Sequence, residues 1–297
     1  MIRYTNSEVS RIRKSNIKYQ VSENVLNTIK SIVKEVGSPT YIKTPSFSNK
    51  KRKHKHDTFT GIPSHKMPEK TYPILQEIQG LLNKFSEKTF DKLKDQLIAL
   101  LEKSKSTDED ITFADVTGKI YEIVSIQSYN VVLYGKLYSI LVELYPEFKE
   151  LCCVEYNKYM ENFQSIKAVN ADTDYEGFCK ANKFNDQIRS LSMFYVELLK
   201  HDILQVFDIA KLISSLQSNL IDVGQYDTPD ENPCIEYSEN IFILVTGCYN
   251  KLKSYESWDT IQSNILKVRQ TDKKVHKNIS NKVIFKHMDI LDFIKKQ

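Results

Sequence analysis

Long hydrophobic runs are missing from this chain of 297 residues. No stretch approaches the roughly 18 to 20 consecutive apolar residues that span a bilayer, so we expect no membrane partner. The N-terminus also lacks the apolar core of a secretory signal. The five cysteines form no CxxC pair, which argues against a zinc framework and suits a reducing compartment. We therefore expect a cytoplasmic protein.

Glycine and proline are also scarce, with eight residues of each. Both residue types punctuate turns, and a fold built from many short strands needs a large supply of them. Their scarcity argues against a β-rich architecture and for long helices joined by modest loops.

Motifs that carry chemistry are absent from the sequence as well. None of the six histidines belongs to an HExxH motif or a Cys/His cluster, and there is neither a glycine-rich phosphate loop nor a GxSxG element. We therefore expect a binding protein, not an enzyme, with no metal and no cofactor. A helical enzyme of unknown chemistry is the alternative from a different class.

Charge divides the chain into a basic tail and a mildly acidic body. Residues 1–66 contain 14 Lys and Arg against 4 Asp and Glu, which leaves 28 against 34 in the remainder. Charge and turn residues together predict three regions: partner-binding helical segments at 1–36, a basic flexible linker at 37–67 and a folded body at 68–297.

Apolar residues of the body recur at helical spacing. They predict about ten helices from residue 74 onwards, with Ser86 and Ser280 as N-caps and a long break at 222–233. Long helices joined by short loops predict an all-α fold of HEAT-like stacked hairpins, an α-solenoid of about five repeats. Because no repeat period is legible, an irregular helical bundle remains the alternative.

Four segments of the body follow the order of segments in a known family. Residues 78–93, with the sequence IQGLLNKFSEKTFDKL, resemble the first repeat of the middle domain of eukaryotic translation initiation factor 4G. Residues 119–134, 189–199 and 280–292 are similar to its second repeat, its third repeat and its closing helix. The resemblance covers about 75–295 and implies a HEAT-repeat domain.

This resemblance implies a scaffold that holds the two lobes of a DEAD-box RNA helicase of the 4A type. By motif position, the helicase-binding residues are Leu82, Phe85 and Phe90. All three also have core spacing, so they either contact the helicase or hold the shape of the first repeat. Glu87 stands where the family has Pro, and Arg189 is the remnant of its basic third-repeat run. Related middle domains occur in nuclear cap-binding, splicing and mRNA-decay adaptors, which form the alternative function.

A short helix ahead of the middle domain recruits the cap-binding protein, initiation factor 4E, in the factor 4G family. Its pattern is Tyr-x4-Leu-apolar, and Tyr4 begins a similar element here. Thr5 and Glu8 have capping-box spacing, which predicts a helix directly after Tyr4. The resemblance implies that this element binds a 4E-type cap-binding protein. The residues assigned to the contact are Tyr4, Val9, Ser10, Ile12 and Arg13.

A second amphipathic helix is predicted at 21–36, with Ser22 as its cap. Its apolar face, which includes Val25 and Ile29, is too large to leave in water. Two interpretations stay open: a further contact on the cap-binding partner through Val25 and Ile29, or packing against the body.

The densest basic run of the linker consists of Lys50, Lys51, Arg52, Lys53 and Lys55. Such a run suits nonspecific contact with the mRNA backbone. A nuclear localisation signal and a plain solvated linker are the alternatives. Together with the basic linker, the resemblance implies a translation initiation scaffold that joins a cap-binding protein, mRNA and a helicase.

Overall fold

The computed structural model describes residues 5, 7–8, 10–11, 21–36, 72–106, 111–163, 166, 169, 171–224, 232–272 and 275–297. The chain separates into two compact units, residues 1–57 and 58–297, and each is described by itself. Throughout the described residues the regular secondary structure is helical, with no strand. The all-α expectation is therefore confirmed.

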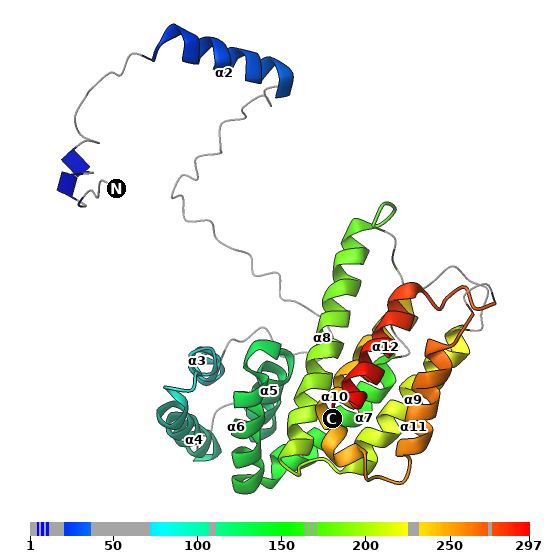
Figure 1. Ribbon diagram of the computed structural model, residues 1–297. Coiled ribbons are helices and arrows are strands. Elements are labelled where there is room, and N and C mark those ends of the chain that lie inside the picture. Colours follow the sequence, from blue (N-terminus) through cyan, green and yellow to red (C-terminus); the bar gives the residue numbers. More distant parts are fainter. Residues whose placement is uncertain are drawn as a thin grey trace. The chain divides into compact units, whose positions relative to one another are not determined.

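The first unit contains helix α2 (Glu23–Val36) and a short helical segment that includes Ser7, Glu8, Ser10 and Arg11. The second unit, the body, contains ten α-helices and one 3-10 turn, η1, within the described residues (Figure 1). They are α3 (Pro73–Leu82), α4 (Phe90–Ser106), α5 (Phe113–Ile126), η1 (Ser128–Asn130), α6 (Val131–Leu144), α7 (Pro146–Asn162), α8 (Tyr175–Lys200), α9 (Val206–Gly224), α10 (Asn232–Leu252), α11 (Trp258–Arg269) and α12 (Asn281–Lys295).

Several helix starts follow from local chemistry. Pro73 and Pro146 open α3 and α7, where the missing N–H of proline has no helical partner to lose. Thr112 and Asp115 form a complete capping box at the start of α5. The carboxylate of Asp174 accepts a hydrogen bond from the Gly177 N–H and caps α8.

The prediction of Ser86 as an N-cap is wrong. Helix α4 begins at Phe90, and Ser86 lies in the preceding turn, where its N–H donates to Thr89 Oγ1 over 3.0 Å. Ser280 does sit at the N-cap of α12, but its hydroxyl makes no capping hydrogen bond. The break predicted at 222–233 is shorter, because α9 continues to Gly224 and α10 begins at Asn232.

The helices of the body pack in two rows. One row places α6, α8, α10 and α12 in consecutive contact, and in the other row α3 packs on α5, α5 on α7, and α9 on α11. Contacts between the rows include α5 with α6, α9 with α10, and α11 with α12, and α4 packs on both α3 and α5. A single apolar core runs through the body and includes members of every helix from α3 to α12.

Helix α8 is the longest helix of the body, at 26 residues, and two neighbours approach it very closely (Figure 1). A Cβ on Gly135 of α6 would lie 2.5 Å from Glu197 Cβ, and a Cβ on Gly247 of α10 would lie 2.7 Å from Val196 Cγ1. Glycine is required at both positions because only its bare backbone lets the helices come this near.

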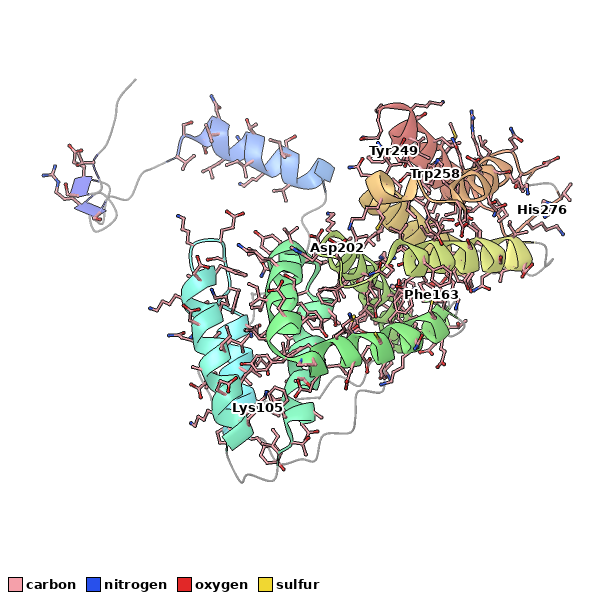
Figure 2. All side chains as sticks on the ribbon, turned by 90° about the horizontal axis from the view of Figure 1, so that it is seen from below. Lys105, Phe163, Asp202, Tyr249, Trp258 and His276 are labelled. Atoms are coloured by element: carbon pink, nitrogen blue, oxygen red, sulfur yellow. The ribbon has the colours of Figure 1, made fainter. Side chains whose placement is uncertain are left out.

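The turn after α8 contains Asp202, labelled in Figure 2, with a φ of 59°. Asp tolerates this left-handed conformation better than most residues. The ammonium of Lys251 on α10 fixes the turn, with Nζ 2.7 Å from the Leu199 carbonyl oxygen and 2.5 Å from Asp202 Oδ1. Among the described helices, none has the length and apolar content to cross a bilayer.

Candidate functional site

The three residues assigned to helicase binding are buried side chains at the end of α3, in the following turn and at the start of α4. Leu82 is fully buried, and Phe85 and Phe90 are 5% and 4% exposed. The rings of Phe85 and Phe90 meet edge to face, with their centroids 5.8 Å apart. Of the two interpretations that the sequence left open, the structure places all three in the core, so their side chains present no contact surface of their own.

Tyr134 of α6 connects this core to a neighbouring turn. Its ring packs on Phe85, and its hydroxyl lies 3.1 Å from the Leu82 carbonyl oxygen and 3.0 Å from Gln127 Oε1. The Gln127 amide then donates to Asn83 Oδ1 over 3.3 Å. Burial raises the pKa of Tyr134, so its hydroxyl keeps its proton and remains a donor. Two turns, 83–89 and 127–130, are thereby held side by side, and we call them the turn pair.

The turn pair and the start of α6 carry the exposed groups of this region. Tyr129 is 97% exposed, and Val132, at the start of α6, is 62% exposed. The side chains of Lys84, Lys88 and Lys136 are also exposed. Lys136 Nζ lies 4.6 Å from the Phe90 ring centroid, which places its charge beside the start of α4.

The sequence pattern did not single out Tyr129 as a candidate site residue. Its neighbours Val131 and Leu133 pack against the core, and the helical pattern assigned the whole stretch to packing. The available signal was the change from α5 to a 3-10 turn. A residue in such a turn belongs to the buried face of neither neighbouring helix.

Four hydrogen bonds from tyrosine hydroxyls join segments that are distant in sequence. One links α5 to α8, and the other three link α7, or Phe163 directly after it, to α8, α9 and α10. We call them the tyrosine seam. They are Tyr121 with Tyr195 at 2.9 Å, Tyr159 with Ser192, Tyr156 with the Asp208 carbonyl oxygen at 2.7 Å, and Tyr237 with the Phe163 carbonyl oxygen at 3.2 Å. Figure 2 labels Phe163 at the end of α7. The seam fixes the relative position of distant segments because each buried hydroxyl would lose its partner if they moved apart.

Arg189, the remnant of the basic run expected in the third repeat, is engaged within the body. Its guanidinium contacts Glu236 of α10 over 2.5 Å and also pairs with Asp186. Burial raises the pKa of Glu236, while the charge of Arg189 opposes that effect. This pair joins α8 to α10, so the structure gives Arg189 a packing role.

The capping box predicted at the N-terminus is confirmed. The Thr5 N–H donates to Glu8 Oε2 over 2.7 Å, and the Glu8 N–H donates to Thr5 Oγ1 over 3.4 Å. The bonds from Thr5 lower the pKa of Glu8 because they stabilise its carboxylate. Ser10 is exposed on the helical segment that follows. Of the other residues assigned to the cap-binding protein, Tyr4, Val9, Ile12 and Arg13 lie outside the described residues.

Helix α2 carries the predicted amphipathic face. Its described apolar side chains are 43% to 53% exposed: Val25, Leu26, Ile29, Ile32 and Val33. The two residues assigned to partner binding, Val25 and Ile29, therefore lie on one apolar stripe of α2 that the first unit itself does not cover. The run from Lys50 to Lys55 lies outside the described residues.

Metal chemistry has no evident centre in the part of the chain that the structure describes, where no group of three or more His, Cys, Asp or Glu side chains is suitably placed. The three buried cysteines are Cys152, Cys234 and Cys248. Burial raises the pKa of the Cys152 and Cys248 thiols to about 12, which keeps them protonated at neutral pH.

Comparison with known proteins leaves the chain unassigned, because no family model matches it and no curated protein shows significant sequence similarity to it.

Proposed function

We propose that this chain is a translation initiation scaffold of the factor 4G kind. The helical body binds a DEAD-box helicase of the 4A type, the N-terminal unit binds a 4E-type cap-binding protein, and the basic linker contacts mRNA. In this proposal the chain has no catalytic residues, and the chemistry belongs to the helicase.

The observation that carries the proposal is the packing of the body in two rows. Pairing each helix with the next in sequence gives five successive hairpins: α3 with α4, α5 with α6, α7 with α8, α9 with α10, and α11 with α12. That count supports five HEAT-like repeats in the order expected from the resemblance. A stack of this kind suits a scaffold because it holds well-separated surfaces at fixed positions.

Leu82, Phe85 and Phe90 contribute to helicase binding through shape in this proposal. Their burial and the Tyr134 clamp support an indirect role, in which they position the turn pair for the partner. Loss of any one of them would weaken binding by deforming that surface, with a parallel loss of stability.

The capping box at Thr5 and Glu8 supports a docking helix in the N-terminal unit. Helices this short are marginal in water on their own. The apolar face that Val25 and Ile29 share on α2 supports a further contact on the same cap-binding partner, because nothing within the first unit covers it.

Pull-down of a 4A-type helicase with the full chain, followed by an ATPase assay with RNA, tests the central proposal. We expect a stoichiometric complex and a stimulated ATPase rate. A chain that neither binds the helicase nor changes its rate would refute the proposal and favour the nuclear cap-binding, splicing or mRNA-decay adaptors.

The N-terminal contact is tested separately with a 4E-type protein. We expect Tyr4→Ala and Val9→Ala to abolish binding, whereas Tyr175→Ala, an exposed tyrosine of the body at 71%, serves as the matched control. Equal binding by all three variants would remove the Tyr4 element from the proposal.

The linker contact is tested with single-stranded RNA at two salt concentrations. Replacing the five basic residues from Lys50 to Lys55 with Gln should reduce both the affinity and its salt dependence, because fewer counterions are released. An unchanged salt dependence would show that the linker does not touch RNA.

A further inference from the structure

We propose that Tyr129, with Val132 beside it, anchors the protein-docking surface of the turn pair. The partner surface that fits it is an acidic protein lobe with an apolar pocket, which under the proposed function is a lobe of the helicase. The inference rests on that function and moves the direct contact from the buried Leu82, Phe85 and Phe90 to residues that were not assigned before.

Exposure is the first argument. Tyr129 is 97% exposed, more than any other large apolar or aromatic side chain among the described residues. Val132 follows three positions later at 62% exposure. Tyrosine is enriched among the residues that dominate protein interfaces, because it buries a large rigid ring and offers a hydroxyl at the rim.

Rigidity is the second argument. The 3-10 turn that carries Tyr129 is closed by the Asn130 N–H, which donates to the Gln127 carbonyl oxygen over 3.2 Å, and the turn lies against α8. The Gln127 side chain is tied to Asn83 and to Tyr134. A ring held on a fixed turn loses little conformational freedom on binding, which favours affinity.

The excess of exposed lysines is the third argument, and it indicates an acidic partner. The exposed lysines of the turn 83–89 and of the start of α6, Lys84, Lys88 and Lys136, outnumber by one the exposed acids Glu87 and Asp91. The chain from residue 67 onwards has 28 basic against 34 acidic residues, so this edge departs in sign from the body around it. An acidic partner surface would be attracted to these lysines. The same partner would be repelled by most of the remaining, acidic surface of the body.

The aliphatic neighbour favours protein over nucleic acid. A base stacked on Tyr129 would bring its phosphates to the lysines but would leave Val132 without a partner. An apolar pocket on a protein covers both side chains at once, and Val132 and Lys136 lie one helical turn apart on the same face of α6.

Binding of the 4A-type helicase to full-length variants tests the assignment. We expect Tyr129→Ser and Val132→Ser each to raise Kd at least about tenfold, and Tyr129→Phe to stay within a few-fold of wild type. Lys136→Glu should also weaken binding and flatten its salt dependence. Matched controls are Tyr175→Ser and Phe207→Ser, which remove exposed aromatic side chains from the starts of α8 and α9.

The outcomes distinguish the docking role of Tyr129 from the proposed helicase-binding function. If the wild-type chain binds the helicase and Tyr129→Ser binds equally well, the docking assignment is overturned and the scaffold function stands. A wild-type chain that does not bind at all overturns both. If Tyr129→Ser instead weakens binding to an oligo(U) strand and leaves helicase binding unchanged, the surface is a nucleic-acid contact and the protein assignment is wrong. Because both side chains are exposed, thermal unfolding should be the same in every serine variant.

Discussion

The hydroxyl oxygens of Tyr121 and Tyr195 lie 2.9 Å apart in the buried contact between α5 and α8. Burial raises the pKa of both residues well above the ordinary value, so each keeps its proton and one hydroxyl donates to the other. Both side chains are buried, so each hydroxyl depends on the other for its hydrogen bond.

Removal of one hydroxyl from this pair should cost more than removal of both. Tyr121→Phe or Tyr195→Phe leaves the remaining hydroxyl buried without a partner, so we expect each to lower the free energy of unfolding by about 1–3 kcal/mol. The double variant should be less destabilised than either single variant, because it leaves no buried hydroxyl without a partner. Urea unfolding of the four proteins measures this coupling, and strict additivity would show that the bond contributes nothing specific.

Glycine-to-alanine substitutions should separate into two classes. Gly135→Ala places a Cβ 2.5 Å from Glu197 Cβ, so we expect a loss of about 1–3 kcal/mol from the resulting shift of α6 against α8. Gly118→Ala in α5 meets nothing within 4 Å and should stabilise by about 0.5–1 kcal/mol through helix propensity. Thermal unfolding distinguishes them, and equal effects of the two would contradict the close crossing.

Acid should destabilise the body in part through His287. This residue is fully buried in α12, its Nδ1 lies 3.0 Å from the Val283 carbonyl oxygen, and burial lowers its pKa to about 4. In the unfolded chain this histidine takes up a proton near pH 6.5. The contribution of neutral His287 to the free energy of unfolding is therefore complete above that pH. It is lost as the pH falls from 6.5 towards 4, and amounts to about 3 kcal/mol.

The variant His287→Leu isolates this effect from the titration of carboxylates. Its free energy of unfolding should fall less steeply than that of the wild type between pH 6.5 and 4. Parallel curves over that interval would show that His287 does not titrate on unfolding.

Thiol reactivity should follow burial in the native state. Cys153 and Cys179 are exposed, whereas Cys152, Cys234 and Cys248 are buried. A thiol reagent at pH 8 should therefore modify two of the five cysteines rapidly and the other three only on unfolding. Substitution of both Cys153 and Cys179 with Ser should remove the rapid phase, and a surviving rapid phase would mean that one of the buried helices opens readily.

The sequence predicted the helical class and most helices of the body because their apolar residues recur at a period that only a helix satisfies. Ser86 was misassigned because a serine before an apolar run fits an N-cap and a tight turn equally well, and the contact with Thr89 that decides between them is a feature of the folded chain. The capping box at Thr5 and Glu8 was predictable because its four residues are local.

The site was harder to predict than the fold. Leu82, Phe85 and Phe90 fit both a core and an interface by spacing, and only their burial separates the two roles. Tyr129 gave no periodic signal, because its exposure depends on where η1 lies against α8. Long-range contacts of this kind, such as that of Gln127 with Asn83, are set by tertiary packing and leave no local pattern.

The close approaches at Val196 and Glu197 restrict how the length of this chain can change over evolution. One residue inserted into α8 just ahead of them would turn every later side chain of the helix by about 100°, and the backbones of Gly135 and Gly247 would then face the wrong side chains. Insertions and deletions should therefore be excluded from the C-terminal half of α8. They should accumulate between α9 and α10 or ahead of Tyr175, where a change in length leaves both crossings in register.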